Sequence, residues 1–127
     1  MKAILRTPAV IATLCVVCIA TFGHHGNSAY DEKHQITLKG VVTEFAFVNP
    51  HTQIYFDVKN DKGEVVHWAC ESLGPGILAM LGWTSKTLKP GDEITVTLDP
   101  AKSGNPVGYL RKIVLADGTA LPLRTIQ

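Results

Sequence analysis

The sequence predicts a mainly β protein: a small closed or partly open barrel of five to six strands, with one short helix between strands three and four. From Ile36 onward, short segments alternate apolar and polar residues, which is typical of strands with one buried face. One helical stretch interrupts them after the third segment. The first segment is long and contains Gly40, and barrel closure requires such a bent strand. This order is OB-like, the oligonucleotide/oligosaccharide-binding topology, and a plain β-sandwich is the alternative.

The first three strands are predicted over residues 36–48, 52–58 and 65–71, with a bulge or bend at Gly40. Between the second and third strands, "NDKGE" predicts a three-residue hairpin loop, Asp61 to Gly63, with the glycine in the left-handed conformation. That loop sets the register of the two strands. On the apolar face it pairs Phe56 with Trp68 and Ile54 with Cys70; on the outer face it pairs Asp57 with His67 and Gln53 with Glu71.

The next segment, 74–83, predicts a short helix because its apolar residues recur at helical spacing. Pro75 near its start and Gly82 near its end are typical helix boundaries. Strands are then predicted over 93–99 and 107–116, and Asp117-Gly118 turns the chain into a last short strand over 119–123.

The amino-terminal region predicts an export signal. Lys2 and Arg6 precede an uncharged run over 9–22, about fourteen residues long, which is shorter than the roughly 20 that a membrane span needs. We therefore expect a cleaved signal peptide over 1–23, a flexible segment over 24–35 and an OB-like domain over 36–127. The protein would be periplasmic or secreted, and would meet the membrane only through its leader during export.

Removal of the leader leaves ten basic and eleven acidic side chains, a net charge near −1 with neutral histidines. This charge argues against nucleic acid as a partner. Cys15 and Cys18 depart with the leader, so Cys70 is left alone and no internal disulfide is expected.

His24 and His25 lie at the junction between the leader and the domain, and they are candidate metal ligands. Cleavage after Gly23 would make His24 the terminal residue, whose amine and imidazole form a chelate. Cleavage after Phe22 would make His25 the third residue of the new chain. The free amine, two deprotonated amides and one imidazole could then bind copper(II) or nickel(II) in a square plane. Cleavage after Ala20 would remove both arrangements. His51, in the "NPH" turn, is a candidate third ligand if the tail folds back.

No catalytic constellation is expected. His67 and Cys70 are three residues apart on one predicted strand, so their side chains point to opposite faces. We expect His34 to be solvated. Phe56 and Trp68 should face the core, whereas Tyr30, Tyr55 and Trp83 are expected to be partly exposed.

Several short motifs together span nearly the whole mature chain: "HH" at 24–25, "YD" at 30–31, "TLKGVV" at 37–42, "VNPH" at 48–51, "IYFDV" at 54–58, "LGWTSKTLKPGD" at 81–92 and "LADG" at 115–118. In this combination the chain resembles an uncharacterised family of small exported bacterial proteins, defined only as a domain of unknown function. Gly26 stands where members usually have serine, and Cys70 where an apolar residue is expected. The resemblance implies a periplasmic, barrel-like domain and implies no activity.

Two functional hypotheses follow. The first is a non-catalytic exported binding or interaction module that contacts a small ligand or an envelope protein through its surface and end loops. The second is a protein that binds or delivers copper or nickel through His24, His25 and His51. An enzyme ranks third.

Overall fold

The structure is a computed structural model of the protein that describes residues 29–124. The predicted leader and the His24-His25 pair lie outside these residues. Five strands and one helix are present in the described chain: β1 (Ile36–Ala46), β2 (Gln53–Lys59), β3 (Val65–Glu71), α1 (Pro75–Met80), β4 (Glu93–Pro100) and β5 (Val107–Leu115). Within residues 29–124, no helix has the length and apolar character needed to cross a membrane.

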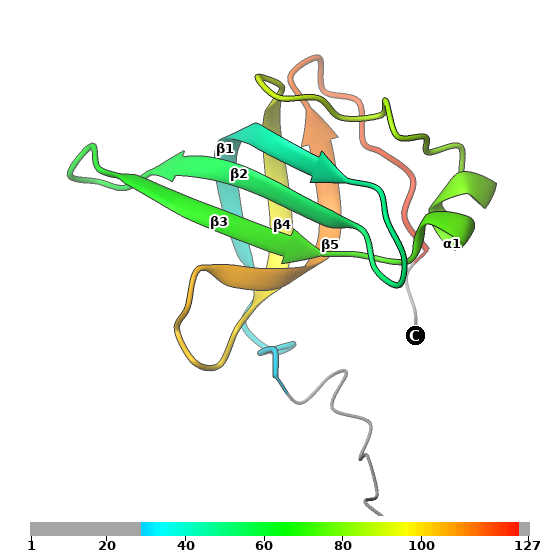
Figure 1. The fold of residues 1–127 in the computed structure, drawn as a ribbon. Helices are drawn as coiled ribbons and strands as arrows, with labels where there is room; N and C mark the ends of the chain where they lie inside the picture. The colour runs from blue at the N-terminus through cyan, green and yellow to red at the C-terminus, as the bar shows by residue number, and fades with distance from the viewer. Residues whose placement is uncertain (1–28, 125–127) are drawn as a thin grey trace, which may run out of the picture.

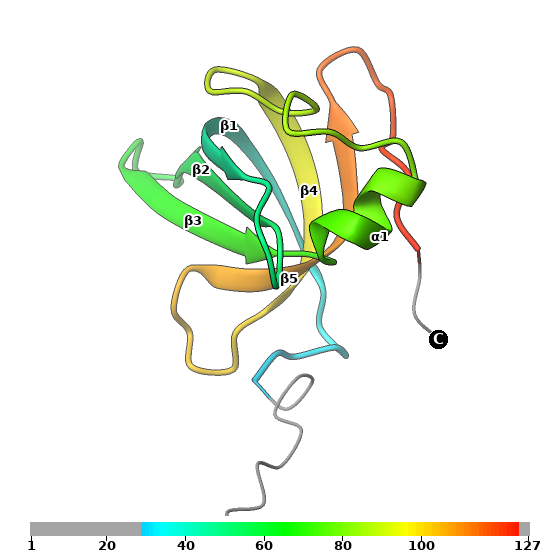
Figure 2. The same ribbon diagram turned by 45° about the vertical axis from the view of Figure 1, so that its right-hand side comes forward.

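The strands form a closed barrel in the order β1-β2-β3-β5-β4, which confirms the predicted OB-like barrel (Figure 1). The helix α1 follows β3 and precedes β4, as predicted. The β2–β3 hairpin extends to one side of the barrel, and α1 lies on the opposite side (Figures 1 and 2). The molecule therefore has a hairpin end and a helix end.

The predicted register of β2 and β3 is confirmed. Phe56 pairs with Trp68, Ile54 with Cys70, Asp57 with His67 and Gln53 with Glu71. Gly63 has a φ of 77°, and the amide of Asn60 donates to the Glu64 carbonyl at 2.9 Å. Since side chains alternate between the two faces of a strand, this register leaves Asp57, His67 and Glu71 on the outer surface.

The strand β1 bends so that its first part pairs with β4 and its second part with β2. Gly40 lies at this bend, where a Cβ atom would come within 2.6 Å of the Asp57 carbonyl oxygen. The predicted bend is confirmed, but the bulge lies further on, because the β1–β2 register shifts between Val42 and Glu44. Gly40 is needed for close approach of two backbones rather than for an extra residue.

The barrel interior is filled by the inward side chains of all five strands and by residues of and after α1. These buried apolar residues are Val42, Ile54, Phe56, Cys70, Leu78, Trp83, Leu88, Ile94, Val96, Leu98, Leu110 and Ile113. The expectation of a partly exposed Trp83 was wrong. Its side chain is only 2% exposed, and its indole Nε1 donates to the Pro122 carbonyl at 2.8 Å.

The strand β5 closes the barrel. It pairs in parallel with the end of β3 over three residues, from Val107 to Tyr109, and antiparallel with β4 along its length. Beyond β5, Ala120 forms a single bridge with Val114. The sixth strand allowed for over 119–123 is therefore absent from the described chain, although the segment still lies against β5.

Candidate functional site

The main polar cluster on the outer surface centres on Glu71, the last residue of β3. Its Oε1 lies 2.5 Å from Nδ1 of His51, in the loop between β1 and β2. Its Oε2 accepts a hydrogen bond of 3.1 Å from the Tyr30 hydroxyl. The Tyr30 ring lies 6.1 Å from that of Tyr109 on β5. We call Tyr30, His51, Glu71 and Tyr109 the rim site.

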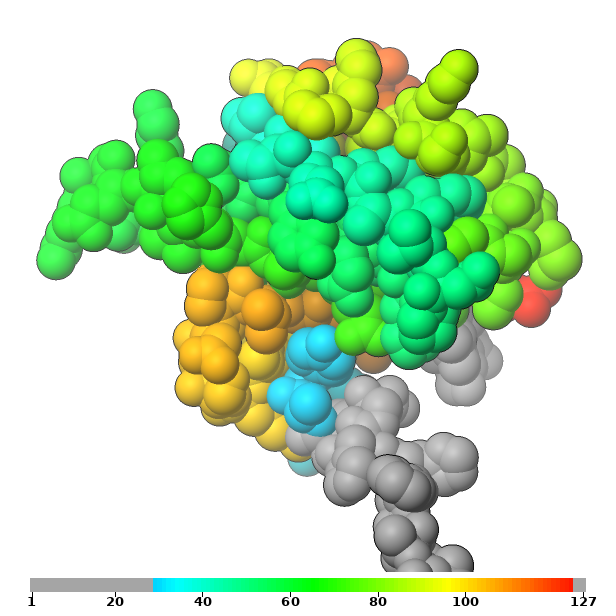
Figure 3. Space-filling model, in the orientation of Figure 1, coloured from blue at the N-terminus to red at the C-terminus, as the bar shows by residue number. Residues whose placement is uncertain are grey.

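The segment before β1 is held at the rim by backbone contacts with the end of β4. Tyr30 forms a bridge with Ala101, and the amide of Asp31 donates to the Pro100 carbonyl at 2.8 Å. The amide of Lys102 donates to the Ala29 carbonyl at 3.0 Å. Figure 3 shows this blue segment seated beside the β4–β5 loop. The chain ahead of β1 is thus part of the barrel surface, and it carries Tyr30 onto Glu71.

Electrostatics at the rim keep the phenols neutral. Burial, reinforced by the charge and hydrogen bond of Glu71, raises the pKa of Tyr30 to about 12. Burial also raises the pKa of Tyr109. Near neutral pH both side chains are therefore hydrogen-bond donors beside a carboxylate, and neither is a proton acceptor that could act as a base.

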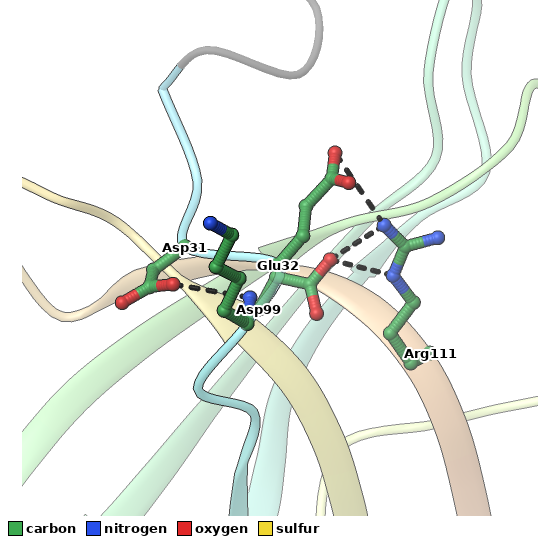
Figure 4. Close-up of polar contacts among 5 residues, drawn as sticks. Asp31, Glu32, Asp99 and Arg111 are labelled. Carbon is green, nitrogen blue, oxygen red and sulfur yellow. Dashed lines mark hydrogen bonds and ion pairs between the residues drawn. The ribbon is translucent and has the colours of Figure 1, made fainter.

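An ion pair between a buried carboxylate and a partly exposed guanidinium lies next to the rim site. Asp99 on β4 is fully buried, and its Oδ2 accepts hydrogen bonds from Arg111 on β5, at 2.6 Å from Nε and 2.5 Å from Nη2 (Figure 4). Glu32 lies further away, 3.9 Å from Nη2. Asp99 raises the pKa of Arg111 through this contact. The guanidinium also sits 5.0 Å from the centre of the Tyr109 ring, a cation–π distance.

This ion pair depends on an irregularity in β5. Thr97 pairs with Lys112 and Leu98 with Leu110, so Arg111 is an extra residue opposite β4. A bulge of this kind re-aims side chains locally. Sequence reasoning missed both Arg111 and Asp99, because regular alternation gives no signal of a bulge.

The remaining candidates lie apart from one another. Cys70 is buried, and this burial raises its thiol pKa to about 12. His67 is on the outer surface, where its Nδ1 lies 2.5 Å from the Asp57 carboxylate. The strand therefore separates the thiol from the imidazole, as the period of two predicts. His34 is exposed and contacts Asp31 at 2.8 Å.

Metal ligation within the described chain is limited. Of the three histidines proposed as ligands, His51 alone lies within residues 29–124; His24 and His25 lie outside them. No group of three His, Cys, Asp or Glu side chains that could hold a metal ion occurs among residues 29–124. Any complete site would thus need donors from beyond this part of the chain.

Two of the cavities formed by residues 29–124 differ in their charge. One of about 670 Å³ lies at the hairpin end, and its charged residues are balanced: Lys39, Lys59, Asp57 and Glu93. The other, of about 320 Å³, crosses β5 next to Arg111. We call it the β5 cavity.

Comparison with known proteins gives a family and a fold. The model of the "Family of unknown function (DUF6152)" matches residues 11–111. No curated protein matches the chain. The chain is similar to the mitochondrial single-stranded DNA binding protein Rim1 from S. cerevisiae, with 10% identity over 65% of this chain and 92% of that one, at a TM-score of 0.50.

Two weaker structural matches were found. A second crystal form of Rim1 matches at 13% identity over the same shares of the two chains, 65% and 92%, with a TM-score of 0.44. A ZRD-deleted mutant of TiaS in complex with agmatine matches at 21% identity and a TM-score of 0.43. That match covers 72% of this chain and 24% of the TiaS chain. At these identities the likeness to Rim1 concerns the fold alone.

Proposed function

The chain belongs to DUF6152, a family of unknown function, and we propose that it is an exported, non-catalytic binding module that contacts its ligand through the rim site. The observation that carries this proposal is the Glu71 carboxylate. It holds His51 from one loop and Tyr30 from the segment before β1 at the same point. OB folds bind ligands on the face of strands two and three and on the loops after strands one and four. The rim site occupies that location.

The chemistry of the rim site suits a ligand rich in hydrogen-bonding groups. Glu71 offers acceptors, Tyr109 offers a hydroxyl donor, Tyr30 offers its ring face, and Tyr55 adds an exposed aromatic ring on β2. A hydroxyl-rich small molecule or the polar surface of an envelope protein would satisfy these groups. A non-catalytic role agrees with the burial of Cys70, whose thiolate is disfavoured at neutral pH.

Rim1 is by its title a single-stranded DNA binding protein, and we propose that this chain does not share that partner. The surface of β2 and β3 presents the carboxylates of Asp57 and Glu71. Binding of single strands depends on cations that track the phosphates. An oligonucleotide should leave the intrinsic fluorescence and gel mobility of the protein unchanged at low salt. A salt-sensitive mobility shift would contradict this.

The binding proposal is tested by site-specific photo-crosslinking in cells that export the protein. A crosslinker at Gln53, opposite Glu71, should give a discrete adduct, and the Glu71→Ala variant should lose it. The matched control places the crosslinker at Lys62 in the hairpin loop, where no adduct is expected. Equal adducts at both positions, or persistence of the Gln53 adduct in Glu71→Ala, would remove the rim site from the function.

The second candidate is binding or delivery of copper(II) or nickel(II) through His24, His25 and His51. One observation favours it: Nδ1 of His51 is held by Glu71. An ionised carboxylate only accepts hydrogen bonds, so Nδ1 is the donor of this contact and Nε2 is the ring nitrogen left to face a metal ion. Histidine ligands of metals are typically held by a carboxylate in this way. His25 precedes Tyr30 of the rim site by five residues. The connecting chain therefore keeps the Cα atom of His25 within about 18 Å of the Tyr30 Cα atom.

This candidate depends on where the leader is cut. Mass spectrometry of the exported protein identifies its first residue, and copper titration then compares wild type with His24→Ala/His25→Ala and with His51→Ala. Both variants should bind copper more weakly if the ligands are correctly assigned. A first residue of Thr21, or wild-type affinity in the double variant, excludes the metal hypothesis.

A further inference from the structure

The β5 cavity differs in charge from the rest of the protein. Its lining includes three cationic side chains, Arg111, Lys112 and Arg124, and no aspartate or glutamate is among the described residues that line it. Ser72, Thr97 and Tyr109 add hydroxyl-bearing side chains to the lining. The mature chain as a whole is close to neutral, so this cavity is a local concentration of positive charge.

The bulge in β5 creates this concentration. In a regular strand, Arg111 and Lys112 would point to opposite faces. Because the register shifts between Thr97 and Leu98, both residues instead lie opposite the same part of β4. Leu110 and Ile113 on either side remain buried in the barrel core, so the bulge adds a cation to the surface without disturbing the interior.

Arg111 is already oriented for a ligand. Asp99 holds its Nε and Nη2 on one edge. In Figure 4 the third guanidinium nitrogen points away from both Asp99 and Glu32. A guanidinium fixed on one edge loses little side-chain entropy when the other edge binds an anion. Lys112 and Arg124 are exposed and bring two further charges that Asp99 does not neutralise.

We infer that the β5 cavity binds the phosphate group of a small molecule. Lys112, Arg124 and the free edge of Arg111 can each give an oxyanion a charge-assisted hydrogen bond, the strongest kind that side chains make. A volume of about 320 Å³ is at the lower end of small-molecule sites and fits a phosphate with a short carrier. The inference does not rest on the rim function, because the rim site is built around a carboxylate and the two sites share only Tyr109.

The experiment compares two double variants in the mature protein by NMR titration with inorganic phosphate, at constant ionic strength set with chloride. Lys112→Ala/Arg124→Ala removes two cations from the cavity, and Lys59→Ala/Lys62→Ala removes two from the hairpin as the charge-matched control. Arg111 is left intact because it neutralises Asp99. Wild type and the control should show saturable shifts of the β5 amides, and the cavity variant should bind at least about tenfold more weakly.

Three results would overturn the inference: no saturable shift in wild type, equal weakening in both double variants, or equally tight binding of acetate. Tighter binding of a single-stranded oligonucleotide than of glycerol phosphate would also overturn it.

Two further arms of the experiment identify the source of the phosphate. Retention on phosphatidylcholine vesicles that contain phosphatidic acid indicates a lipid headgroup, whereas binding of glycerol phosphate without retention indicates a free solute. Rim variants such as Glu71→Ala should leave phosphate binding unchanged, so failure of one site does not imply failure of the other.

Discussion

Two histidine–carboxylate pairs lie on the same outer surface of β2 and β3, and they differ in their surroundings. At the rim, His51 contacts Glu71; near the hairpin, His67 contacts Asp57, which we call the hairpin pair. Both distances are 2.5 Å. The side chain of His51 is 54% exposed and that of His67 is 83% exposed. Glu71 also accepts a bond from Tyr30, a residue 41 positions away, whereas the hairpin pair joins only neighbouring strands.

This difference shows that a pairwise contact does not identify a site. A surface pair held by one hairpin contributes little, because water competes for both groups. The rim pair brings together a loop, the end of a strand and the segment before β1, so losing one group affects several elements.

The largest effect is expected next to the rim site, at Arg111. Arg111→Ala would leave the buried carboxylate of Asp99 without its partner and should lower the free energy of unfolding by about 3 kcal/mol. Lys112→Ala, on the adjacent exposed residue, should change it by less than about 0.5 kcal/mol. Urea denaturation measures both. Similar values for the two variants would mean that Asp99 is not held by Arg111 as described.

A direct comparison of the two carboxylates comes next. Glu71→Ala removes contacts with both His51 and Tyr30 and should destabilise the protein by about 1–2 kcal/mol. Asp57→Ala removes one exposed contact and should cost less than about 1 kcal/mol. Urea denaturation of the two variants measures both losses in the free energy of unfolding. If Asp57→Ala is the more damaging change, the rim is no more interconnected than the hairpin.

The rim also predicts a pH dependence. The pKa of Tyr30 is raised from 10.0 to about 12, so the fold favours the protonated phenol. This contribution is fully present below the unfolded value of 10.0 and is lost as pH rises towards about 12. Tyr30→Phe should reduce the fall in stability across that interval and remove a late step from the phenolate absorbance titration. Loss of a step near the ordinary value of 10.0, in place of the late step, would place Tyr30 away from Glu71.

The smallest effect is expected at His67. Because Cys70 faces the core and His67 faces solvent, His67→Ala should leave the rate of Cys70 alkylation unchanged in the native protein. Alkylation should be slow in both proteins until they unfold. A slower reaction in His67→Ala would show that the imidazole activates the thiol, contrary to the strand geometry.

Much of the fold could be predicted from sequence because local signals agreed. The turn at Gly63 and the alternation of Ile54 and Phe56 point to one register, and the structure has that register. Trp83 was wrongly expected to be partly exposed: the helix predicted to reach it ends at Met80, and the chain beyond that end carries Trp83 into the core. A bulge or bend was expected at Gly40; the bend lies there, but the bulge occurs between Val42 and Glu44, because glycine marks both bulges and close backbone contacts.

The site was less predictable than the fold. His51 was identified by its residue type, but Tyr30 and Glu71 meet only through the tertiary structure. Glu71 was predicted to lie on the outer face, and its strand pairing with Gln53 was the single contact predicted for it. The ion pair of Asp99 and Arg111 depends on one extra residue in β5, which an alternating pattern does not reveal.

The anchoring of Tyr30 at the rim affects how the protein should be tagged for study. Any polypeptide fused ahead of Tyr30 begins its path beside Glu71, so a purification handle there would compete with a ligand at the rim. A handle fused after Arg124 begins next to the β5 cavity. The loop between β2 and β3 projects from the barrel on the side opposite α1 (Figure 1), and none of its residues belongs to the rim site or lines the β5 cavity, so it is the best insertion point for an epitope or a fluorophore.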